Sequence, residues 1–280
     1  MKQSQPIGER PREPKAITSL TNDRVKAIRA LEMRKVRKQT GLFVAEGASL
    51  LVTARDNGFV PRTLVYQAGT ADGGVSKGLV TWALKEGAEV LEVSAQVLSK
   101  LASKDNPQTM LGVFSQSFAD APKAGDLDEG QTWLALEEVR DPGNLGTIIR
   151  TCDAVGVAGI LLIGNCCDPY SLESIRATMG SIFCVPLVRT NVASFMALAA
   201  EWPGDVVATD LKAAEDFRAV RYRGPQLVVM GSEGPGLSEG LARAATRRVK
   251  IPMAGRLDSL NLAIATALTL YQIRGAHLKL

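Results

Sequence analysis

The chain has 280 residues, 46% of them hydrophobic, which exceeds the usual size of one domain and can give each of two domains a buried core. Its 4 cysteines include no C-x-x-C pair and fit neither a zinc site nor a disulfide framework, and its single histidine, His277, argues against a Ser-His-Asp triad or a histidine metal cluster within one chain. The net charge of +4 is uneven, because residues 1–40 carry 11 Lys and Arg against 4 Asp and Glu.

The beginning of the chain does not have the composition of a targeting segment. Residues 1–15 contain three prolines and several charges without apolar periodicity, which predicts a mobile tail. Nowhere does the sequence reach the ~18 uninterrupted apolar residues of a membrane-spanning helix. We therefore expect a cytoplasmic protein with no membrane partner and no metal.

Residues 16–117 alternate between strand-like and helix-like patterns, which predicts a small α/β domain. Strands are expected at Leu42–Ala45, Thr63–Tyr66, Val90–Val93 and Met110–Phe114, and helices at Asn22–Lys38, Ala48–Asp56, Gly78–Glu86 and Ala95–Ser103. On or near the first of these helices are the basic residues Arg24, Lys26, Arg34, Lys35, Arg37 and Lys38. Their charges suit RNA phosphates, and an ordinary solvated helix face is the alternative interpretation.

Residues 118–131, rich in Asp, Gly, Pro and Ala, are the best candidate for a linker, and a second domain is expected over residues 132–280. Its strands are expected at Trp133–Glu137, Gly159–Ile163, Val185–Val188, Val206–Thr209, Leu227–Met230 and Val249–Ile251, and its final helix at Ser259–Ala276. Helix-like patterns separate these strands. The alternation predicts an α/β fold with a parallel sheet covered on both faces.

Three segments of the second domain place polar residues where a strand gives way to a helix. They are Asp141–Ala154, Met230–Ser238 and Ile251–Ala263. In an open α/β sheet, such junctions line the crevice in which ligands bind. We therefore expect the three segments to contribute to one site.

The order and spacing of these segments resemble the three signature motifs of the SpoU family, the TrmH-like ribose 2′-O-methyltransferases of the SPOUT class. Residues 16–117, with the run from Phe43 to Gly47 as the clearest match, resemble the RNA substrate-binding domain, similar to a ribosomal protein, that often precedes this catalytic domain. The resemblance implies a deep trefoil knot in the mostly parallel sheet domain and a homodimer through that domain. It also adds Glu46 to the RNA-binding candidates, with a structural role as the alternative.

The cofactor that the resemblance implies is S-adenosylmethionine. One wall of its site is expected from Met230, Gly231, Glu233, Gly234 and Gly236, and the other from Ile251, Ser259, Leu260 and Asn261. Glycines permit close approach of the backbone, and main-chain groups can then bond an adenine edge. The alternative is that the glycines only make tight turns and that Ser259 only caps the final helix.

Catalysis is expected from Arg150, supported by Asn144 and Glu233. The resemblance gives the matching arginine a direct role, sometimes as the base that takes the 2′-hydroxyl proton. An arginine with a pKa above ~12 is a poor base at neutral pH, so we prefer a role in holding an RNA phosphate and stabilising the developing alkoxide. Glu233 is the more conventional base, and a structural ion pair between Arg150 and Glu233 is the alternative.

The sequence therefore predicts an S-adenosylmethionine-dependent RNA ribose 2′-O-methyltransferase that acts on ribosomal RNA. Transfer RNA is the alternative substrate, and methylation of a small molecule or a protein by the same fold is less favoured. A noncatalytic RNA-binding or ribosome-assembly factor is the main rival. The presence of Asn144, Arg150, Glu233, Ser259 and Asn261 favours the enzyme over that rival.

Overall fold

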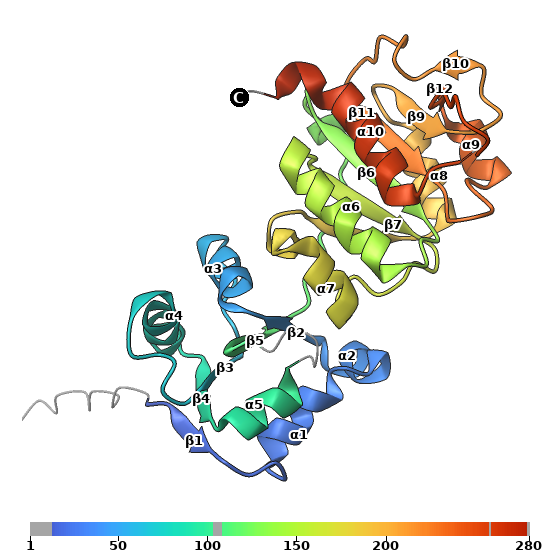
Figure 1. Cartoon of the computed structure of the whole chain (residues 1–280). Coiled ribbons are helices and arrows are strands. Elements are labelled where there is room, and N and C mark those ends of the chain that lie inside the picture. The colour runs from blue at the N-terminus through green and yellow to red at the C-terminus, as the bar shows by residue number, and fades with distance from the viewer. Residues whose placement is uncertain (1–12, 103–107, 258, 279–280) are drawn as a thin grey trace, which may run out of the picture. The chain divides into compact units, whose positions relative to one another are not determined.

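The computed structural model describes residues 13–102, 108–257 and 259–278, and the chain divides into two compact units, residues 1–116 and 117–280 (Figure 1). Each unit has its own sheet. Within the described ranges, none of the helices combines the length and the apolar character needed to cross a membrane.

The first unit is a mixed five-stranded sheet with the order β1-β4-β3-β5-β2. Its strands are β1 (Lys15–Ile17), β2 (Leu42–Glu46), β3 (Thr63–Gln67), β4 (Glu89–Val93) and β5 (Met110–Ser115). Its helices are α1 (Asp23–Ala30), α2 (Arg34–Thr40), α3 (Ala48–Asp56), α4 (Gly74–Lys85) and α5 (Ala95–Leu101). Strand β5 runs antiparallel to β2 and β3, whereas the other pairs are parallel. The predicted α/β domain is therefore present.

The single basic helix expected over Asn22–Lys38 is wrong, because the chain breaks into α1 and α2. The backbone of Leu31 ends α1 and its side chain is buried, and Met33 is extended before α2 begins. Arg37 stabilises the break by donating from one guanidinium nitrogen to the carbonyls of Leu31 and Glu32, both at 2.8 Å. These carbonyls have no partner inside a helix that ends there.

Two of the expected RNA-binding residues are buried in the described structure. Arg37 is only 4% exposed because its guanidinium closes the break between α1 and α2. Glu46 is 8% exposed at the end of β2. Burial at this level leaves neither side chain at the surface of the described structure, and a role of these two residues in RNA binding stays a prediction.

The mobile tail expected at residues 1–15 lies almost wholly outside the described residues. Only 13–15 are described, and Lys15 already begins β1, which pairs in parallel with β4 through Lys15 and Leu91. A strand of three residues leaves too short a pattern to recognise in the sequence.

The second unit is a seven-stranded sheet in which every pair of neighbouring strands is parallel, with the order β10-β12-β9-β11-β6-β7-β8. Its strands are β6 (Thr132–Glu137), β7 (Gly159–Ile163), β8 (Leu187–Thr190), β9 (Val206–Thr209), β10 (Glu215–Asp216), β11 (Gln226–Met230) and β12 (Arg247–Lys250). Its helices are α6 (Pro142–Val155), α7 (Leu172–Thr178), α8 (Val192–Ala200), α9 (Glu239–Ala244) and α10 (Leu262–Arg274). The central strands β6, β7 and β11 are buried throughout, as expected for a parallel sheet covered on both faces.

The alternation along β6 decides which helices its side chains meet. Trp133 and Ala135 belong to a core cluster with Phe195 of α8 and Leu241 of α9. Helices α6 and α10 contribute no residue to this cluster and pack against each other (Figure 1). Glu137, the last residue of β6, lies two positions after Ala135. Its side chain therefore lies on the same face of the sheet as those of Trp133 and Ala135.

Residues 118–131 contain one short 3-10 turn, Ala124–Asp126, and begin with a packed aromatic ring. The ring of Phe118 meets that of Tyr170 edge to face, with centroids 5.3 Å apart, and the Arg189 guanidinium lies 3.9 Å from the centroid of Phe118. The Tyr170 hydroxyl also accepts from the backbone N–H of Ser117 at 3.0 Å. The beginning of the expected linker is thus fixed to the second unit.

Candidate cofactor and catalytic site

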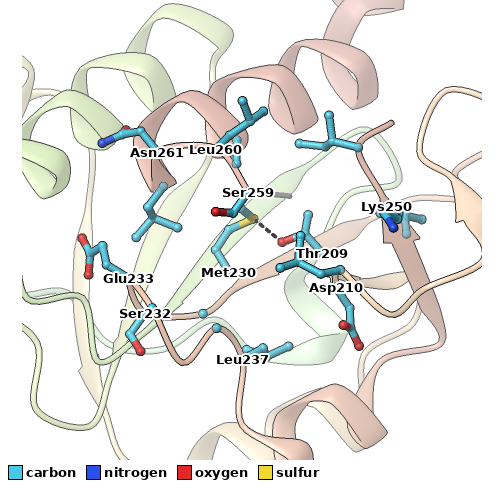
Figure 2. Close-up of a pocket in the computed structure, with 18 of the residues that line it drawn as sticks. Thr209, Asp210, Met230, Ser232, Glu233, Leu237, Lys250, Ser259, Leu260 and Asn261 are labelled. Carbon is cyan, nitrogen blue, oxygen red and sulfur yellow. Dashed lines mark hydrogen bonds between the residues drawn. The ribbon is translucent and has the colours of Figure 1, made fainter. Parts of the chain in front are cut away.

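A cavity of about 490 Å³ lies at the carboxyl ends of β9, β11 and β12 and at the beginning of α10 (Figure 2). In a parallel sheet the carboxyl ends of all strands meet at one edge, and the order β12-β9-β11 makes these three ends neighbours. The lining includes every residue expected for the cofactor site: Met230, Gly231, Glu233, Gly234, Gly236, Ile251, Ser259, Leu260 and Asn261.

The loop that follows β11, residues 231–238, closes upon itself. Ser232 and Gly236 exchange two backbone hydrogen bonds, of 3.1 and 3.0 Å. A Cβ at Gly231 would come within 2.1 Å of the backbone of Gly236 and Leu237, so the absence of a side chain at 231 serves the packing of the loop. Gly234, with φ of +90°, adopts the backbone conformation that glycine favours.

The segment before α10 supplies the opposite wall, and Asn261 begins the helix. The Asn261 side-chain oxygen accepts from the backbone N–H groups of Ala263 at 2.9 Å and Ile264 at 3.3 Å. This residue, rather than Ser259, is the helix cap, so the helix expected from Ser259 begins at Leu262. Ser259 lines the cavity instead.

Side-chain hydrogen bonds connect the three predicted segments. Asn261 donates from Nδ2 to Asn144 Oδ1 at 2.9 Å, and Asn144 donates from Nδ2 to Glu233 Oε1, also at 2.9 Å. Because Asn261 Oδ1 already accepts from the helix, its amide nitrogen must face Asn144. The carboxylate of Glu233 can only accept, which fixes the Asn144 amide in the same direction. The sequence-predicted residues Asn144, Glu233 and Asn261 therefore form one ordered cluster, which we call the amide relay.

Glu233 is held as a carboxylate. Its second oxygen, Oε2, accepts from the backbone N–H of Arg140 at 3.2 Å. Partial burial alone would raise the pKa of Glu233, but hydrogen bonds from the Asn144 side chain and from backbone N–H groups outweigh it and hold this pKa below its ordinary value. A carboxylate with a lowered pKa is a weaker base, so the geometry favours an orienting role for Glu233 over proton abstraction.

Arg150 is not part of this cluster. It lies on α6 six residues after Asn144, about 240° further around the helix, and its side chain is exposed. Arg150 does not line the cavity, and its side chain makes no hydrogen bond or ion pair with any residue of the described ranges. The ion pair between Arg150 and Glu233, considered from the sequence, is absent from the described structure.

The expected basic surface of the first unit divides into paired and unpaired cations. Arg24 pairs with Glu89 at 3.1 Å, and Lys26 pairs with Asp23 at 3.2 Å. Arg34, Lys35 and Lys38 are exposed on α2 and have no ion-pair partner among the residues that the structure describes. Among the six expected RNA-binding cations, these three are therefore the most available to a phosphate.

Sequence reasoning missed several residues of the cavity. Thr209 ends β9 and Asp210 follows it, and Lys250 ends β12. In Figure 2 they lie at one end of the cavity, whereas Glu233 and Asn261 lie at the other. Both strands were predicted, so the rule that ligands bind at the carboxyl ends of parallel strands was the signal that could have identified these residues.

All four cysteines are free thiols in the structure. Cys152 and Cys166 are buried, and Cys167 and Cys184 are partly buried. Burial, followed by the neighbouring Cys166, Glu233 and Asp141, raises the pKa of Cys167 to about 12. A thiol with so high a pKa is neutral at ordinary pH.

A parallel sheet with a cofactor-sized cavity at its carboxyl edge, preceded by a smaller mixed-sheet domain, defines a two-domain protein of the α/β class that binds a small molecule at strand ends. The chain belongs to the SpoU rRNA methylase family, whose model matches residues 131–271. Residues 22–112 match the MRM3-like substrate binding domain.

Three relatives extend over nearly the whole chain. An uncharacterized tRNA/rRNA methyltransferase of Synechocystis sp. is 34% identical, over 92% of this chain and 93% of its own. The 23S rRNA (guanosine(2553)-2′-O)-methyltransferase RlmP of Bacillus subtilis is 28% identical, over 93% and 100%. The crystal structure of an AdoMet-bound rRNA methyltransferase from Sinorhizobium meliloti is 44% identical with a TM-score of 0.86, over 95% and 99%.

Proposed function

We propose that this protein is an S-adenosylmethionine-dependent ribose 2′-O-methyltransferase that acts on ribosomal RNA. The relatives named above support this activity. The observation in this chain that carries the proposal is the amide relay, because it connects Asn144, Glu233 and Asn261 at a cavity of cofactor size. Its place at the cavity favours an enzyme over a noncatalytic assembly factor.

The cavity fits S-adenosylmethionine in size and in chemistry. Its volume of about 490 Å³ lies within the ~300–1,000 Å³ of small-molecule sites. The side chains of Met230, Leu237, Ile251 and Leu260 offer apolar surface to an adenine ring, and the loop 231–238 offers backbone polar groups. When bound, S-adenosylmethionine supplies a methyl group made electrophilic by its sulfonium.

The chain's own residues must then place the ribose hydroxyl and stabilise its oxygen as the proton leaves. The amide relay holds the end of the cavity at which Asn261 and Glu233 lie in one geometry, which favours in-line placement of the attacking oxygen. Arg150 provides a fixed positive charge for an RNA phosphate and for the developing alkoxide. We leave the proton acceptor unassigned, because neither Arg150 nor the low-pKa Glu233 is a good base.

Dimerisation is part of the proposal. Helix α10 exposes three large apolar side chains, Ile264, Leu268 and Tyr271, which are 51%, 42% and 50% exposed. Their spacing puts them on one face of the helix, and a second copy of the chain is the occupant that we propose for this face. Because Arg150 lies outside the cavity of its own chain, a homodimer would also allow it to act at the partner's site. The deep trefoil knot of the second domain likewise stays a prediction from the family resemblance.

The first domain is proposed to hold structured RNA. Its unpaired cations Arg34, Lys35 and Lys38 suit phosphates and carry no base specificity, so shape and backbone contacts would dominate recognition. Domain boundaries at 16–117 and 132–280, and a cytoplasmic location, also stay predictions.

The substrate class can be tested by incubating the full chain and labelled S-adenosylmethionine with RNA from cells that lack the protein, separated into ribosomal and transfer fractions. Label in the ribosomal fraction is the expected result. Label confined to the transfer fraction would support the alternative substrate. No label in either fraction, from a protein that binds both RNA and S-adenosylmethionine, would support an assembly factor.

A further inference from the structure

Two glutamates connect the loop 231–238 to the end of β6 in a reciprocal way. Glu137, the last residue of β6, accepts the backbone N–H of Ser238 at 2.7 Å. In the opposite direction, Glu233 of the loop accepts the backbone N–H of Arg140 at 3.2 Å. Each of the two segments therefore offers one carboxylate to the backbone of the other.

The two bonds hold different parts of the loop. Glu233 follows closely on β11, whereas Ser238 ends the loop and begins α9. Between them, Gly234 and Gly236 are exposed, and the bonds of Ser232 with Gly236 are internal to the loop. Internal bonds give the loop its shape but do not fix its position against the sheet, so that position depends on the contacts at its two ends.

Glu137 is an unusual residue at the end of a buried parallel strand. It is 8% exposed, and it forms no ion pair with any residue in the described ranges. Burial of a carboxylate is costly unless hydrogen bonds compensate for the lost water. A hydrogen bond from a backbone N–H to a carboxylate offsets part of this cost, because it is roughly twice as strong as a hydrogen bond between neutral groups.

The other end of β6 provides a contrast. Thr132, at the beginning of the strand, is fully buried and hydrogen-bonds Gln226 of β11 at 2.8 Å. Both bonds join β6 to the chain of β11 or its loop. The neutral pair of Thr132 and Gln226 lies at the amino end of the strands, away from the cavity. The carboxylate of Glu137 lies at the carboxyl end, where the cavity opens.

We propose that Glu137 is a positioning residue of the cofactor site. By holding Ser238, it fixes the far end of the loop 231–238 and so the wall that Gly234, Gly236 and Leu237 contribute to the cavity. This inference rests on the proposed function, since the ligand concerned is S-adenosylmethionine. It assigns Glu137 no contact with that ligand.

The test compares the dissociation constant for S-adenosylmethionine, measured by titration calorimetry without RNA, in the full-length wild-type chain, Glu137→Ala and Glu137→Gln. Glutamine keeps an oxygen that can accept the Ser238 N–H but loses the charge. We expect affinity to fall about 10-fold for alanine and about threefold for glutamine. With RNA present, KM for S-adenosylmethionine should rise in the same order while kcat stays within about twofold of wild type.

Thr132→Val is the matched control, because it removes a buried hydrogen bond from the same strand at the edge away from the cavity. It should lower the melting temperature without changing affinity for S-adenosylmethionine. Unchanged affinity in a folded Glu137→Ala chain, or an equal loss of affinity in Thr132→Val, would overturn the positioning role. If glutamine binds as weakly as alanine, acceptance of the Ser238 N–H is not what matters, and the inference is again overturned. A folded wild-type chain that fails to bind S-adenosylmethionine would instead contradict the proposed function.

Discussion

Asn261 and Asn144 are joined by a 2.9 Å hydrogen bond between their side chains, although 117 positions separate them in the sequence. Each amide has only one orientation that satisfies its neighbours: Asn261 bonds the beginning of α10, and Asn144 bonds Glu233. The relay thus couples the position of the final helix to the loop that lines the cavity. Changes within it should affect the cofactor site before they affect the overall fold.

Asn144→Asp tests the direction of the relay. The new carboxylate still accepts from Asn261, but it meets the carboxylate of Glu233 where an N–H donor stood. Two like charges in contact raise the apparent pKa values of the pair, so one proton shared between them relieves the repulsion in acid. We expect methyl transfer to fall about 10- to 100-fold at pH 8 and the ratio of variant to wild-type activity to rise as pH is lowered.

Asn165→Asp is the control for this substitution, since Asn165 is exposed on the loop after β7. It adds the same charge and should leave activity near that of wild type throughout the pH range. A pH-independent defect in Asn144→Asp would show that repulsion by Glu233 is not its cause.

Glu233→Gln tests the lowered pKa through stability. A carboxylate whose folded pKa is lowered stabilises the fold above its ordinary pKa, and this contribution disappears as pH falls through the lowered value. Glutamine also offers only one acceptor oxygen where Glu233 uses two, for Asn144 and Arg140. We expect the variant to melt below wild type at about pH 6 to 8 and the difference in melting temperature to shrink as pH falls below the ordinary glutamate pKa of about 4.3.

Glu239→Gln is its comparison, because Glu239 is an exposed carboxylate on α9 that pairs with Arg243. Exposed pairs of this kind contribute little, so its melting temperature should stay close to that of wild type. If the difference in melting temperature between wild type and Glu233→Gln grew as the pH was lowered, it would contradict a lowered pKa for Glu233.

The basic surface of α2 can be tested by the salt dependence of RNA binding. Changing Arg34, Lys35 and Lys38 together to glutamate should weaken binding and reduce the slope of log affinity against log salt by about one for each lost phosphate contact. The matched control changes three exposed lysines outside α2, Lys77 and Lys85 of α4 and Lys100 of α5, to glutamate. Equal effects of the two variants would mean that net charge, rather than the α2 surface, governs binding.

Leu268→Lys tests the proposed dimer surface. A charge in the middle of the exposed apolar face of α10 should convert the dimer to a monomer in light scattering after size exclusion. Gln272→Lys adds the same charge to an exposed position next to that face and should leave the dimer intact. A wild-type chain that is monomeric at micromolar concentration would remove the dimer from the proposal.

Much of the fold follows from apolar patterns in the sequence. The structure has the expected bounds for β7, β9 and α3, because each is a continuous or periodic pattern ended by a polar or glycine residue. The break between α1 and α2 was not predictable in the same way. It depends on burial of Leu31 and on bonds from Arg37 to carbonyls five and six residues earlier, which local helix preference does not reveal.

The residues of the candidate site that belong to a sequence motif could be predicted. Those that reach the site only through the fold could not. Asn144, Glu233 and Asn261 were identified from three motif segments, but their hydrogen bonds arise only when α6, the loop after β11 and the beginning of α10 meet. Glu137 reads in sequence as one more residue of a strand. Its role depends on the backbone of Ser238, which is 101 positions away.

The most direct test of the proposed function is to digest the labelled ribosomal RNA to nucleosides and identify the methylated position by mass spectrometry, for the wild-type chain and for Arg150→Ala. We predict a 2′-O-methylated nucleoside with the wild-type chain and a loss of at least about 100-fold with Arg150→Ala, whose affinity for S-adenosylmethionine should be unchanged because Arg150 lies outside the cavity. Methylation of a base instead of the ribose, or no methylation of any RNA by a protein that binds both substrates, would contradict the proposed activity. Full transfer by Arg150→Ala would remove Arg150 from the chemistry.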